Sequence, residues 1–74
     1  MSIEAPTAEE IARHYSSALD SVNLINELMA LDARDEGQTA TVARNVEHLE
    51  IMVAKDYWTT EDLAPFNAAI TAGS

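Results

Sequence analysis

The chain contains no cysteine among its 74 residues. Disulfide bonds and thiolate metal sites are therefore excluded as sources of stability. Large aromatic residues are scarce too, with one phenylalanine, one tryptophan and two tyrosines. A domain of this size buries only about 60% of the surface that its unfolded chain exposes. We therefore expect one marginally stable domain over residues 1–74, which packs very efficiently or borrows a partner's surface, self-association being a natural solution.

Basic residues are also few. Four lysines and arginines face thirteen acidic residues, giving a formal net charge of −9. The bases are scattered along the chain, whereas contact with phosphate relies on clustered bases. This balance opposes binding to nucleic acid or anionic lipid, and it would steer the chain toward basic protein partners. The same acidity is also ordinary for a small helical protein that stays in solution.

No apolar run approaches the roughly 18 residues of a membrane span. The longest dense apolar stretch covers only residues 51–54. The chain begins without the basic start and apolar segment of a secretory signal. These absences predict a cytoplasmic protein with no membrane partner.

Apolar residues that recur at alternating spacings of four and three are the main feature that is present. This period describes one face of an α-helix and does not fit a strand. A long row comprises Ile11, Tyr15, Ala18, Val22, Ile25 and Met29. Two shorter rows comprise Val42, Val46, Leu49 and Val53, and then Leu63, Phe66 and Ile70.

The first helix is predicted over residues 8–33, after a loose lead-in at residues 1–6. Thr7 followed by Glu10 matches a capping box at its start. Leu24, Leu28 and Leu31 widen its apolar stripe, and so broad a stripe usually contacts more than one neighbouring helix.

The second helix is predicted over residues 40–57, with Thr39 or Thr41 as its cap. Gly37 precedes it and suits a left-handed turn. The connection is short, so the first two helices should be antiparallel neighbours.

The third helix is predicted over residues 62–72, capped within the run Thr59–Asp62 and ended by Gly73. The expected fold is therefore all-α: a long antiparallel helical hairpin with a short third helix closing one end, a small three-helix bundle that forms homo-oligomers.

No pattern of catalytic or metal-binding residues is specific enough to indicate chemistry. His14 and His48 are the only histidines, and neither has a glutamate three residues before it, as di-iron helices require. His14, Ser17 and Asp20 would point side by side along one helix and so cannot converge like a catalytic set. Asp32, Asp35 and Glu36 lack the alternate spacing of a calcium loop and read as a solvated turn. We expect no enzyme activity, no metal and no cofactor.

Tyr57 and Trp58 are the sharpest candidates for binding, since these residue types dominate interaction hot spots. They are adjacent, so one can close the core while the other faces solvent. Core packing is favoured because aromatic residues are few. The complete set of candidate interaction residues is Tyr57, Trp58, Leu24, Leu28, Leu31, Val46, Asp32, Asp35 and Glu36.

The run ARNVEHLEIM at residues 43–52 and the segment YWTTEDLAPF at residues 57–66 carry a resemblance. From Val42 to Gly73 the chain resembles small uncharacterised proteins of tailed bacteriophages and prophages. The resemblance covers under half of the chain and includes no catalytic motif. It implies a viral or prophage origin, with the protein in the host cytoplasm or in the virion, and no established activity.

Two functions are consistent with these features. The first is a protein–protein interaction module, a structural or assembly component of a phage particle that self-associates through apolar helix faces. The second is an acidic inhibitor or adaptor of the anti-defence type. Its carboxylates would imitate a phosphate backbone and occupy the basic groove of a host nucleic-acid-binding protein.

Overall fold

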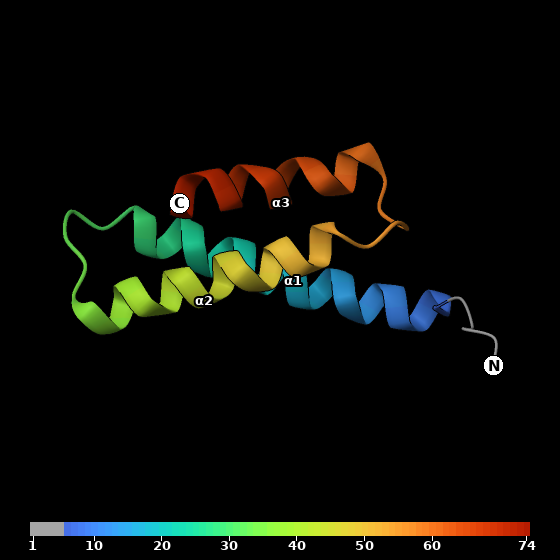
Figure 1. Cartoon of the computed structure of the whole chain (residues 1–74), viewed down its shortest axis with the longest axis horizontal. Helices are drawn as coiled ribbons and strands as arrows, with labels where there is room; N and C mark the ends of the chain where they lie inside the picture. Colours follow the sequence, from blue (N-terminus) through green and yellow to red (C-terminus); the bar gives the residue numbers. More distant parts are fainter. Residues whose placement is uncertain (1–5) are drawn as a thin grey trace.

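The computed structural model describes residues 6–74, so residues 1–5 of the predicted lead-in lie outside the described residues. The described part contains three helices, which are α1 (Ala8–Met29), α2 (Glu36–Val53) and α3 (Thr60–Gly73). Each helix packs against the other two. Figure 1 shows α1 and α2 as an antiparallel hairpin with α3 lying along it. The expected all-α three-helix bundle is thereby confirmed, with α3 lying lengthwise along both helices of the hairpin.

Side-chain caps fix the starts of α1 and α3: α1 begins at the predicted residue with half of the predicted Thr7–Glu10 capping box formed, and α3 begins at Thr60, two residues before the predicted start. The Glu10 amide donates a hydrogen bond to the Thr7 hydroxyl at 3.1 Å. At α3 the Asp62 amide donates to the Thr59 hydroxyl at 3.0 Å, and the Thr59 amide donates to the Asp62 carboxylate at 3.2 Å. Each such cap stabilises its helix by about 1 kcal/mol. The predicted α3 range of 62–72 lies inside the observed helix.

The connection between α1 and α2 differs from the prediction, because α1 ends at Met29 and α2 already begins at Glu36. The Arg34 guanidinium donates to the carbonyls of Leu28 and Leu31, at 3.3 and 3.2 Å, and so satisfies the end of α1. Arginine at this position also suits the negative end of the helix dipole. The predicted end at residue 33 is therefore wrong.

The N-cap of α2 is Asp35, so the predicted caps Thr39 and Thr41 are wrong. The backbone N–H of Gln38 donates to the Asp35 carboxylate at 2.7 Å, and the backbone N–H of Asp35 donates to the side-chain oxygen of Gln38 at 3.0 Å. This capping box draws Gly37 into the first turn of α2, where its φ is not positive. The predicted start at residue 40 and the predicted left-handed turn at Gly37 are both wrong.

The end of α2 also comes earlier than the predicted residue 57. The Met52 carbonyl accepts the Lys55 amide at 3.1 Å and the indole N–H of Trp58 at 2.7 Å. The last carbonyls of a helix lack partners within it, and Trp58 satisfies one of them where α2 ends at Val53 and the chain turns toward α3.

The core is built from the predicted apolar faces. Close packing at the C-terminal end of α3 depends on Gly73, since a Cβ there would lie 2.6 Å from Val46 Cγ2. Near the middle of α3, Phe66 is fully buried. The buried apolar residues are Ala18, Val22, Ile25, Val42, Val46, Leu49, Met52, Trp58, Phe66 and Ala69.

Candidate functional site

A line of side-chain hydrogen bonds joins α1 to α2 and the segment that follows α2; we call it the polar seam. The α1 residues recur at spacings of three and four, so they lie on one side of the helix. Each of these bonds contributes about 0.5–1.5 kcal/mol, and together they fix how the two helices align. The pairs are His14 Nδ1 with the Tyr57 hydroxyl at 2.5 Å, Ser17 Oγ with His48 Nε2 at 3.1 Å, and Ser21 Oγ with Asn45 Oδ1 at 2.8 Å.

Ser17 and His48 have the contact of a nucleophile and its base, but their surroundings do not complete a catalytic site. Ser17 is exposed and lies within α1, whose backbone amides are used by the helix. Amides of this kind cannot form an oxyanion hole over the hydroxyl. Asp20 is exposed and makes no hydrogen bond to either residue in the described structure. The role of the polar seam is therefore to align the two helices.

All four aromatic residues of the chain gather at one end of the bundle. Trp58 is at their centre, with ring centroids 4.6 Å from Tyr57, 5.2 Å from Phe66 and 6.2 Å from Tyr15. Only 9% of Trp58 is exposed. Trp58 therefore closes the core between α2 and α3, and it contributes no exposed binding surface.

Tyr57 is half-buried at the edge of this cluster, where its ring stacks on His14. Burial raises the pKa of the Tyr57 hydroxyl above its ordinary value of 10.0, and the carboxylates of Asp56 and Glu10 raise it further. The phenol therefore keeps its proton to higher pH than a free tyrosine and remains able to hydrogen-bond with His14 Nδ1, in a direction set by the tautomer of the imidazole.

The remaining candidate interaction residues occupy different environments. Val46 is buried in the core, so it is not available to a partner. Leu24 and Leu28 are half-buried, and Leu28 packs against the core. Leu31 lies in the turn after α1 and is 41% exposed. The acidic candidates Asp32, Asp35 and Glu36 are exposed around the same turn, and Asp35 is occupied as the cap of α2.

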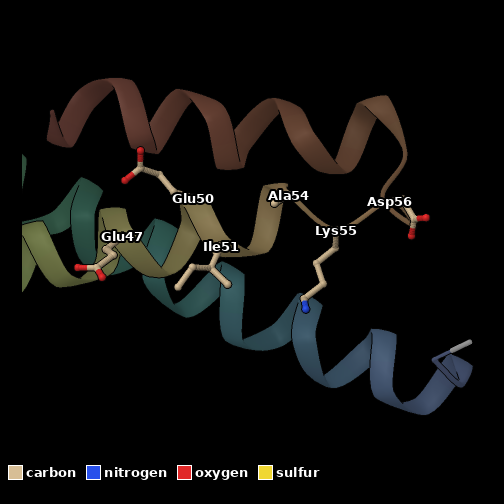
Figure 2. Close-up of a pocket in the computed structure, with 6 residues that line it drawn as sticks. All are labelled: Glu47, Glu50, Ile51, Ala54, Lys55 and Asp56. Atoms are coloured by element: carbon tan, nitrogen blue, oxygen red, sulfur yellow. The ribbon is translucent and has the colours of Figure 1, made fainter. Parts of the chain in front are cut away.

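A shallow hollow on the outer side of α2 was not predicted. Ile51, one of its lining residues, is 58% exposed, and among the described residues the only other exposed large apolar side chain is Leu31. Figure 2 shows Ile51 and Lys55 extending toward α1 while Glu50 points toward α3. The signal in the sequence is that Ile51 falls outside the apolar row of its helix. We call this the α2 hollow; its lining residues are Glu47, Glu50, Ile51, Ala54, Lys55 and Asp56.

Within residues 6–74, no group of three or more His, Cys, Asp and Glu side chains is arranged to hold a metal ion. None of the described helices has both the length and the apolar character required to cross a bilayer. In comparisons with known proteins, no family model, curated protein or solved structure matches the chain. The resemblance of residues 42–73 to bacteriophage proteins therefore stays a prediction.

Proposed function

We propose that this chain is a protein–protein interaction module that carries no chemistry and self-associates through the apolar surface at the end of α1. The observation that carries the proposal is Leu31, which is 41% exposed beside the half-buried Leu24 and Leu28. A symmetric dimer would place this surface against its own copy and remove it from water.

The resemblance to bacteriophage and prophage proteins extends the proposal. It favours a structural or assembly component that acts in the host cytoplasm or in the virion. The outline of the bundle, 47 × 25 × 18 Å, leaves long outer faces on all three helices for contacts in such an assembly.

Sedimentation equilibrium of the wild type, Leu31→Asp and Ile51→Asp tests self-association. We expect the dissociation constant to rise at least about tenfold for Leu31→Asp, because a charge would be buried in the contact. Ile51→Asp is the matched control, since it adds the same charge at the other exposed apolar residue, and it should still associate. A wild type that stays monomeric at high micromolar concentration would contradict the proposal.

The second candidate is an acidic inhibitor or adaptor that competes with nucleic acid for a basic host protein. The excess of acids supports it, since thirteen acidic residues face four basic ones for a formal net charge of −9. These acids are spread along the chain and form no clear double row, which ranks this candidate second. Binding of this kind should weaken steeply as salt is raised. A complex that is insensitive to salt would count against it.

A further inference from the structure

We propose that the α2 hollow is a docking site for a basic amphipathic helix of a partner protein. This surface is separate from the apolar end of α1 and goes beyond self-association. From the start of α2 to Ile51 the helix rises roughly 20 Å, so a partner here would lie away from Leu31.

Ile51 supplies the apolar anchor of this site. It follows Leu49 of the core by two residues, which rotates its side chain by about 200° to the opposite side of α2. Ala54 is also exposed, and its short side chain leaves the hollow open beside Ile51. Covering a bulky apolar residue on an outer helix face removes apolar surface from water and so favours binding of a partner.

The surrounding charges identify the chemistry of the partner. Three carboxylates, those of Glu47, Glu50 and Asp56, line the hollow together with one amine, that of Lys55. An apolar residue ringed mostly by acids is complementary to an apolar residue flanked by lysine or arginine. A second copy is disfavoured, because a symmetric contact would bring the same carboxylates against each other.

The size of the hollow matches a short helix. From Glu47 to its end at Val53, α2 rises about 9 Å, and the lining residues 54–56 continue into the turn that follows, so the hollow corresponds to about two turns of a partner helix. Apolar residues at positions i, i+3 or i+4, and i+7 of such a helix would face Ile51 and Ala54. Its basic residues would lie within reach of the flanking carboxylates.

The test uses the full chain and a fluorescein-labelled 14-residue peptide with leucines at those helical positions and lysines between them. Fluorescence anisotropy at low salt should show micromolar binding. We expect Ile51→Gln to weaken it at least about tenfold, as loss of an apolar anchor does. The double variant Glu47→Gln/Glu50→Gln should weaken it by about three- to tenfold, since it removes two complementary charges.

A matched double variant separates docking from diffuse attraction between opposite charges. Asp20→Asn/Glu27→Gln removes two exposed acids from α1 and should change binding by less than about twofold. Equal losses for the two double variants would overturn the proposal, as would unchanged binding to Ile51→Gln. Dissociation of a wild-type dimer by Ile51→Gln would assign the face to a second copy and overturn it as well.

Two further measurements keep the test independent of folding defects and of self-association. Methyl NMR of the wild type should show the Ile51 methyl signals shifting on addition of the peptide, with no variant needed; unshifted signals would overturn the proposal. Leu31→Asp should bind the peptide as the wild type does, so docking on α2 can succeed or fail whatever the outcome for self-association.

Discussion

At the scale of single residues, the neighbours Tyr57 and Trp58 have different roles, because one side chain lies near the surface and the other lies in the core. Trp58 points into the core and gives its indole N–H to the Met52 carbonyl at 2.7 Å, so its polar atom is satisfied although the ring is buried. Tyr57 keeps its hydroxyl near the surface, where His14 accepts or donates the opposing hydrogen bond. Adjacent side chains outside a helix point in different directions, so Trp58 fills the centre of the aromatic cluster while Tyr57 packs at its edge.

The Tyr57 hydroxyl predicts a dependence of stability on alkaline pH. Burial and nearby carboxylates raise its pKa in the folded state above 10.0, so above pH 10 the unfolded chain loses the proton first. The stabilisation from Tyr57 is therefore complete below pH 10 and is lost as pH rises through the folded-state pKa. Urea unfolding between pH 8 and pH 11.5 should show a steeper decline for the wild type than for Tyr57→Phe.

The Tyr57→Phe variant also provides the control near neutral pH. Loss of the hydrogen bond to His14 should lower its free energy of unfolding by about 0.5–1.5 kcal/mol at pH 7. The difference from the wild type should then shrink above pH 10. Curves that stay parallel over the whole range would show that the hydroxyl is no harder to ionise in the folded chain.

At the scale of helices, local caps decide what the sequence can predict. The start of α1 follows from residue types, because Thr7 precedes Glu10 at the spacing of a capping box. At α3 the capping run Thr59–Asp62 is recognisable, although the helix begins two residues before the predicted residue 62. The start of α2 was harder, because Asp35, Thr39 and Thr41 all suit a cap. Gln38 decides between them by closing a capping box with Asp35, and Arg34 satisfies the preceding helix end. The Asp35–Gln38 pair has the i, i+3 spacing of a capping box and is present in the sequence, but the prediction considered only the threonines; the Arg34 contact depends on how the connection folds, which propensity does not encode.

The two glycines predict opposite effects of the same substitution. Gly73→Ala would place a Cβ 2.6 Å from Val46 Cγ2, so the end of α3 or the Val46 side chain must shift, at a cost of about 1–3 kcal/mol. At Gly37 the nearest atom to an added Cβ is 3.4 Å away, and the residue lies in a helical turn. Gly37→Ala should therefore stabilise the chain, by about 0.5–1 kcal/mol. Thermal unfolding followed by circular dichroism measures both, and a stabilised Gly73→Ala would refute the close packing of α3.

At the scale of the whole molecule, the core was predictable and the outer surface was not. The 3.6-residue period placed Ile25, Leu49 and Phe66 inside, where all three are fully buried. The same reasoning could not separate Val46, which is core, from Leu31, which is exposed, since both are apolar residues on or beside a stripe. The α2 hollow was missed because the exposure of Ile51 is evident only once the packing shows which side of α2 the other helices cover.

The net charge of −9 predicts that salt changes stability and self-association in one direction and binding of the basic peptide in the other. Acids are crowded on a bundle 47 × 25 × 18 Å across, whereas the Debye length falls from about 30 Å at 0.01 M to about 10 Å at 0.1 M salt. Screening should therefore raise the urea midpoint and strengthen self-association, because both bring like charges together. Binding of the basic peptide should instead weaken, since there the charges attract. Urea unfolding, sedimentation equilibrium and anisotropy across one series of NaCl concentrations measure all three.

The combined variant Asp20→Asn/Glu27→Gln/Glu47→Gln/Glu50→Gln should flatten each dependence. A wild-type urea midpoint that falls with NaCl would show that repulsion among the acids does not limit the stability of the bundle.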